Sequence, residues 1–128
     1  METSENYDQT PIESGLKRRL MHAWRSGASW QTEIVDNAQA GRFSSIAVNR
    51  SGYPCIAYQD AANGYLKYAE KSAFGWSIET VDAETATGFY CSLVLNSAGY
   101  PCIAYKDMGA QSLRLAWKEA AGWKKETV

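Results

Sequence analysis

The heptad GYPCIAY occurs at residues 52–58 and again, letter for letter, at residues 99–105 of this 128-residue chain. The second copy lies 47 residues after the first, and the sequence around both copies repeats as well. One inserted residue between Asp82 and Gly88 brings residues 30–75 into register with residues 76–122. A third copy begins at Trp123 with WKKETV. Self-similarity at a fixed period predicts a repeat architecture.

Each unit reads as four short strands separated by turns. Residues 44–48, 54–58, 65–69 and 76–81 are rich in β-branched and aromatic side chains, which favour strands. Between the first two of these runs lies Asn-Arg-Ser-Gly, and its glycine can supply the positive φ that a hairpin turn needs. The first two strands are apolar on both faces, which indicates that both faces are covered.

Four antiparallel strands in a unit of 47 residues match the length of a β-propeller blade, for which ~40–50 residues is usual. The run S-L-V-L-N-S-A-G-Y-P-C-I-A-Y-K-D at residues 92–107 carries a closer likeness. It resembles the four-stranded repeats of bacterial sialidase-like and lectin-like β-propellers. The resemblance covers residues 30–128 and implies an all-β fold with two blades. Where such repeats often have His after the proline, this chain has Cys55 and Cys102.

Two blades do not close a propeller, because a ring of ~4–8 blades is needed to cover the blade faces. We therefore expect an N-terminal arm at residues 1–28 and propeller blades at 29–128, with an extra outer strand at 30–36 and blades at 44–82 and 91–128. We expect homo-oligomerisation to complete the ring. The resemblance to two-blade lectins favours a trimer; the alternative is that the chain is a fragment of a longer propeller.

The sequence of the N-terminal arm predicts a short α-helix over residues 11–25. Thr10-Pro11-Ile12-Glu13 reads as a capping box with proline at the first helical position. Apolar residues then follow at a spacing of four, and Gly27 can end the helix. The basic side chains of this segment, Lys17, Arg18, Arg19, His22 and Arg25, are expected to be a solvated face.

Composition excludes several functional classes. Thirteen basic and fourteen acidic residues give a net charge of −1, which offers no reason to expect nucleic acid or an anionic membrane as partner. Three cysteines without a close C-x-x-C pair predict neither a disulfide framework nor a zinc site, so we expect no metal and no cofactor. The polar N-terminus has no apolar signal region, and no run is long enough to cross a bilayer, so cytoplasmic is the default expectation.

The leading functional hypothesis is a non-enzymatic binding module for carbohydrate. Tryptophan and tyrosine faces stack on sugars, and acidic side chains accept their hydroxyls. The candidate ligand-binding residues are Trp30, Trp76, Trp123, Glu33, Glu79, Glu126, Tyr58, Tyr105, Asp60 and Asp107. The competing interpretation is that these repeated residues serve the fold, with tryptophans packed between blades and aspartates closing turns. The alternative function is a scaffold or assembly protein with no small-molecule ligand.

No catalytic residue is predicted. A sialidase-type glycosidase needs an arginine cluster and a carboxylate pair, whereas the repeats offer only Arg42, Arg50 and Arg114 without a matching constellation. A single histidine, His22, leaves no Ser-His-Asp or Cys-His set.

Overall fold

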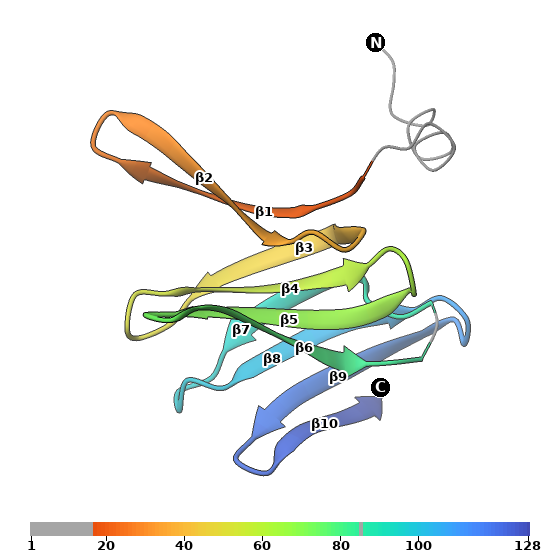
Figure 1. Ribbon diagram of the computed structural model, residues 1–128. Coiled ribbons are helices and arrows are strands. Elements are labelled where there is room, and N and C mark those ends of the chain that lie inside the picture. Colours follow the sequence, from red (N-terminus) through yellow and green to blue (C-terminus); the bar gives the residue numbers. More distant parts are fainter. Residues whose placement is uncertain (1–16, 85) are drawn as a thin grey trace.

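The computed structural model describes residues 17–84 and 86–128 as three stacked antiparallel β-layers (Figure 1). The N-terminal hairpin consists of β1 (Leu20–Ser26) and β2 (Ser29–Asp36). The middle sheet contains β3 (Ala40–Val48), β4 (Pro54–Asp60), β5 (Tyr65–Ser72) and β6 (Gly75–Asp82). The C-terminal sheet contains β7 (Phe89–Leu95), β8 (Pro101–Asp107), β9 (Ser112–Glu119) and β10 (Gly122–Thr127). The all-β expectation and the four strands of each repeat are confirmed.

Both four-stranded sheets pair their strands in chain order, so each strand connects to its neighbour by a tight turn. In the β3–β4 turn, the side-chain oxygen of Asn49 accepts hydrogen bonds from the backbone of Ser51 and Tyr53, each at 3.0 Å. Gly52 closes this turn at φ +88°, a conformation that favours glycine. Asn96 and Gly99 repeat the same turn between β7 and β8. The repeated letters therefore encode a repeated turn.

The helix predicted over residues 11–25 is wrong where the structure describes it. Residues 20–25 form β1, and no helix occurs among the described residues; residues 11–16 lie outside them. A spacing of four residues fits one face of a helix, but it also returns to the same face of a strand, which alternates with period two. Gly27, at φ +62°, does not end a helix but lies in the turn between β1 and β2.

The hairpin also explains the extra outer strand expected at residues 30–36. Strand β2 pairs with β1, and together they repeat the last two strands of each four-stranded sheet. A leucine followed by an alanine three residues later and by a tryptophan ten residues later occurs at Leu20, Leu66 and Leu113. The described residues thus form two whole units preceded by the outer half of a third.

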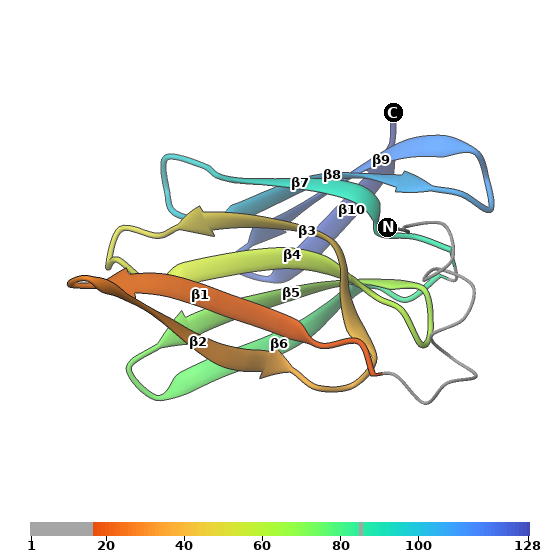
Figure 2. The same ribbon diagram turned by 90° about the horizontal axis from the view of Figure 1, so that it is seen from above.

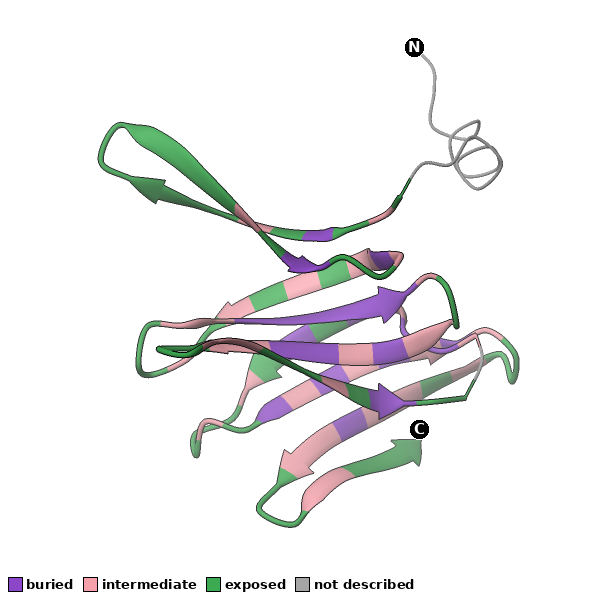
Figure 3. Ribbon diagram, in the orientation of Figure 1, coloured by how far each residue is buried: buried purple, intermediate pink, exposed green. Residues whose placement is uncertain are grey.

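Figure 2 shows the three layers from above. Two hydrophobic cores fill the spaces between them. Between the two four-stranded sheets pack Cys55, Ala57, Leu66, Tyr68, Val81, Cys91, Leu93, Ile103, Tyr105 and Ala116. Between the hairpin and the middle sheet pack Leu20, Val35, Ala40, Ile56, Tyr58 and Ala69. Strand β4 lies between both cores and is almost entirely buried, as its apolar sequence predicts (Figure 3).

Strand β8 has the same core sequence as β4 but a different environment. Its residues alternate between buried and half-buried, because the described chain covers only one face of the C-terminal sheet. The hairpin also leaves part of the middle sheet uncovered, because Ile46 and Val48 of β3 are exposed. Residues 17–84 and 86–128 contain no helix that is long and apolar enough to span a membrane.

Candidate functional site

Four strands end at an aspartate at the same end of the stack. Asp36, Asp60, Asp82 and Asp107 close β2, β4, β6 and β8, and all four are buried. Each accepts a hydrogen bond from the backbone of the turn that follows, as Asp60 does from Ala62 at 2.9 Å. This is the turn-closing role that the competing interpretation assigned to Asp60 and Asp107.

Two tyrosines join the layers at this end. The hydroxyl of Tyr58 donates to Asp36 at 2.7 Å, and that of Tyr105 donates to Asp82 at 2.7 Å. Burial raises the pKa of both phenols, and the carboxylate acceptors raise it further, so both remain protonated donors. Both side chains are fully buried. The two tyrosines therefore present no face to a ligand in this chain.

A second repeated contact, which we call the inter-sheet clasp, joins a glutamate of one layer to a cation and a tryptophan of the next. Glu33 of the hairpin accepts from Lys71 at 2.7 Å and from the indole N–H of Trp76 at 3.1 Å. Burial alone would raise the pKa of Glu33, but the hydrogen bonds from Lys71, His22 and Trp76 outweigh it and lower that pKa. The Glu33 carboxylate is consequently charged at neutral pH.

The same clasp joins the two four-stranded sheets. Glu79 accepts from Lys118 at 2.7 Å and from the indole of Trp123 at 3.2 Å. The structure thus brings together four of the predicted site residues, Glu33 with Trp76 and Glu79 with Trp123, but as contacts between layers. The remaining two, Trp30 and Glu126, lie on β2 and β10, in the first and last layers of the stack, and both are exposed.

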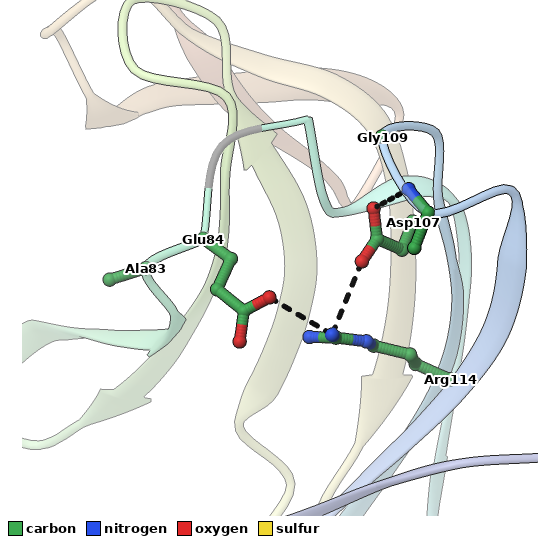
Figure 4. A pocket seen from close by; sticks show the side chains of 6 residues that line it. Ala83, Glu84, Asp107, Gly109 and Arg114 are labelled. Carbon is green, nitrogen blue, oxygen red and sulfur yellow. Dashed lines mark hydrogen bonds and ion pairs between the residues drawn. The ribbon is translucent and has the colours of Figure 1, made fainter.

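An open pocket of about 580 Å³ lies at the aspartate end, between the middle and C-terminal sheets (Figure 4). Its lining residues are Ala83, Glu84, Asp107, Gly109, Ala110 and Arg114. The guanidinium of Arg114 contacts Asp82 at 2.8 Å, Glu84 at 2.9 Å and Asp107 at 3.2 Å. Arg114 extends from β9 between carboxylates that belong to both sheets, and Glu84 is the most exposed of its three partners. We call this group the Arg114 pocket.

Hydrogen bonds in the Arg114 pocket stabilise the charged forms of Asp82 and Arg114. Burial alone would raise the pKa of Asp82, but Tyr105, the backbone N–H of Glu84 and Arg114 stabilise its charged form and lower that pKa. The hydrogen bond to Glu84, with Asp82 adding to it, raises the pKa of Arg114 above its already high ordinary value. Lys125 also contacts Asp82, at 3.4 Å. Three carboxylates therefore face two cations, and the pocket has a net negative charge.

The Arg114 pocket is a departure from the repeat. In the contact between the hairpin and the middle sheet, Lys67 stands where Arg114 does, Ala38 stands in place of Glu84, and Ile78 in place of Lys125. Residues that repeat in every unit are mainly those that the fold requires, whereas the residue type at these three positions differs between units. This difference between otherwise matching units is the feature of the sequence that could have indicated the pocket.

An aromatic cluster lies at the same end, where β3 and β7 begin. Phe43 packs against Phe89 at 5.2 Å and against Tyr90 at 4.6 Å between ring centroids, and Tyr90 is 67% exposed. Phe43 and Tyr90 have φ values of +52° and +53°, at irregularities in the pairing of β3 and β7. Such conformations cost bulky residues ~1–3 kcal/mol and are often found at functional sites. Arg42 lies 5.2 Å from the Phe43 ring centre.

Within the described part of the chain, no group of three or more His, Cys, Asp or Glu side chains is arranged to hold a metal ion. No protein-family model matches the chain, and no curated protein is significantly similar to it.

Proposed function

We propose that the chain is a non-enzymatic, propeller-type binding module. In this proposal the two four-stranded sheets are blades and the hairpin is the outer half of another. Support comes from the 47-residue repeat, from the pairing of strands in chain order and from the face-to-face stacking of the layers. The module recognises its ligand at the contact between blades.

The Arg114 pocket is proposed to bind a polyhydroxylated ligand, most simply a carbohydrate. The observation that carries this is Arg114 held between Asp82, Glu84 and Asp107 beside an open cavity. A sugar hydroxyl both donates and accepts, so neighbouring hydroxyls can bond to a carboxylate and to a guanidinium at once. The net negative charge of the pocket disfavours an anionic ligand.

Glycan-array screening followed by calorimetry with the best sugar tests this proposal. Arg114→Lys keeps the charge but loses the planar donor fork, and Glu84→Gln removes one exposed acceptor. Each is expected to weaken sugar binding at least about tenfold, or ~1.4 kcal/mol. Arg50→Lys is the matched control, because Arg50 is exposed in the β3–β4 turn outside the pocket. Absence of any binding at millimolar sugar, or equal loss in the control, would refute the proposal.

The alternative function, a scaffold that assembles without a small ligand, also has a specific observation in its favour. The indoles of Trp76 and Trp123 and the hydroxyls of Tyr58 and Tyr105 are all engaged between layers. Such a protein would assemble normally and bind no sugar in the array.

The hairpin changes the arithmetic of a closed ring. The resemblance to two-blade lectins favoured a trimer of two-sheet chains, but the hairpin adds a third layer to every chain. Three copies would then supply nine layers, whereas two copies supply six, namely four four-stranded sheets and two hairpins. Six layers lie within the ~4–8 blades of known propellers. We therefore propose a ring of two copies.

A further inference from the structure

The donor half of the inter-sheet clasp, a cation beside a tryptophan ring, occurs three times in the part of the chain that the structure describes. Lys71 lies 5.8 Å from the Trp76 ring centre, and Lys118 lies 6.0 Å from that of Trp123. In the hairpin, Arg25 lies 5.9 Å from the ring centre of Trp30. In all three layers the cation and the tryptophan are direct partners across two paired strands. The hairpin thus presents the same donor pair as the two sheets that follow it.

The acceptor half also occurs three times, but it is displaced by one layer. Glu33 of the hairpin binds the donor pair of the middle sheet, and Glu79 of the middle sheet binds that of the C-terminal sheet. Glu126 is the equivalent glutamate of the C-terminal sheet, three residues after Trp123. Among the described residues no side chain hydrogen-bonds to Glu126 or to the Trp30 indole, and the hydrogen bonds of Arg25 go only to the backbone oxygens of Gly27 and Ala28. One acceptor and one donor pair are left over, at opposite ends of the stack.

The two end faces are also apolar. On the outer face of the C-terminal sheet Leu113 is 52% exposed, whereas Leu66, at the same repeat position in the middle sheet, is 0% exposed. On the outer face of the hairpin Met21 and Ile34 are each 47% exposed and Trp30 is 64% exposed. Each end therefore combines exposed apolar side chains with one half of the clasp, and the two halves have opposite charge.

We propose that a second copy of this chain binds head to tail, so that Glu126 of one copy accepts hydrogen bonds from Arg25 and Trp30 of the next. The contact continues, between chains, the interface that already joins the layers within one chain. A second copy is the occupant that both ends fit, because donor and acceptor lie on different faces of the same molecule. Such a heterologous contact closes into a ring when its rotation allows. The inference deepens the assembly part of the proposed function, on which it rests, and is independent of the pocket ligand.

Charge reversal of each half tests this contact. Glu126→Arg and Arg25→Glu are each expected to raise the dissociation constant for self-association at least about tenfold, because like charges then meet at every interface. An equimolar mixture of the two variants should assemble again. In a two-copy ring, one interface of the mixed dimer pairs Arg at position 126 with Glu at position 25, and the other has the original pair. Sedimentation velocity across a concentration series measures both effects.

Arg50→Glu is the matched control, since it reverses an exposed arginine in a turn away from both end faces. It should assemble as the unaltered chain does, and far-UV circular dichroism should show the same fold for all variants. A monomeric unaltered chain at about 100 μM would overturn the proposal, as would single variants that assemble normally or a mixture that stays dissociated. Sugar binding to the dissociated variants is measured separately, and because the Arg114 pocket lies within one chain, its outcome distinguishes failure of the contact from failure of the ligand proposal.

Discussion

Replacing Asp82 with asparagine removes one charge from the buried end of the contact between the two four-stranded sheets, with almost no change in volume. The carboxylate of Asp82 accepts from Tyr105 at 2.7 Å, from Arg114 at 2.8 Å and from the backbone of Glu84 at 3.1 Å. Asparagine retains one acceptor oxygen but places an N–H₂ group against at least one of these donors. The substitution therefore acts through electrostatics and hydrogen bonding.

The expected cost follows from what each donor loses. Removing one partner of a fully buried ion pair typically costs ~3–5 kcal/mol. Arg114 keeps Glu84 and Asp107, which reduces this cost, while the Tyr105 hydroxyl is buried and loses a charged acceptor worth ~1.5–3 kcal/mol. We expect Asp82→Asn to lower the free energy of unfolding by about 2–4 kcal/mol. That is a large fraction of the ~5–15 kcal/mol typical of a domain.

Urea unfolding followed by tryptophan fluorescence measures this loss at pH 7 and fixed protein concentration. Glu84→Gln serves as the control, because it removes an equal charge from the same arginine at a side chain that is 60% exposed. It is expected to cost less than about 1 kcal/mol, as exposed ion pairs do. If both substitutions lowered the free energy of unfolding equally, the reasoning would be refuted, because it attributes the larger loss at Asp82 to burial and not to the contact with Arg114.

The pH dependence gives an independent check on the Asp82 prediction. The folded-state pKa of Asp82 is lowered, so its stabilisation is fully present above the pKa of an unfolded aspartate, ~3.9, and is lost as pH falls through the folded-state value. The stability difference between the unaltered chain and Asp82→Asn should therefore be constant from pH 7 to about pH 5 and shrink at lower pH. A difference that grows on acidification would contradict this.

Three further predictions concern packing, backbone geometry and thiol chemistry. Leu66→Ala should cost ~2–5 kcal/mol in urea unfolding, whereas Leu113→Ala, at the same repeat position but half exposed, should cost less than about 1 kcal/mol in the monomer. Gly88→Ala should destabilise by more than about 1 kcal/mol, because φ is +77° and the added methyl would lie 3.1 Å from the Leu66 backbone; a neutral effect in the same assay would disprove the clash. Burial raises the pKa of Cys91 to about 12, so peptide mapping after iodoacetamide treatment of the native monomer should find Cys102 labelled and Cys91 protected until unfolding.

Much of the fold could be predicted because turn chemistry and strand periodicity are local. Asn49, Gly52 and Pro54 each have one physical role in the β3–β4 connection, and that role recurs in the second unit. The N-terminal strand was missed because Leu20 and Trp24 satisfy helical and strand spacing equally well. Only the match of Leu20, Ala23 and Trp30 to the later units distinguishes the two readings.

The candidate site was harder to predict for a different reason. The repeated residues Glu33, Glu79, Tyr58 and Tyr105 have the residue types expected of a sugar site, yet their polar groups are engaged between layers. Whether a carboxylate is free for a ligand depends on which side chain of the next layer reaches it, and that pairing is set by the stacking of layers. The Arg114 pocket appears only when the two sheets are seen together.

Residues at equivalent repeat positions show how the exposed fraction of a side chain changes when no further layer packs over its sheet. Leu66 and Leu113 occupy the same repeat position, but only Leu66 has a further sheet packed over it, and their exposed fractions are 0% and 52%. Full burial of a leucine is worth ~1.5–3 kcal/mol. Cys102 and Ala104 are half-buried where Cys55 and Ala57 are buried, so the same deficit extends along β8. An end face that has core residues but no cover gains stability from any layer that matches it, and the layer that we propose for this face is the hairpin of another copy, whose donors match Glu126.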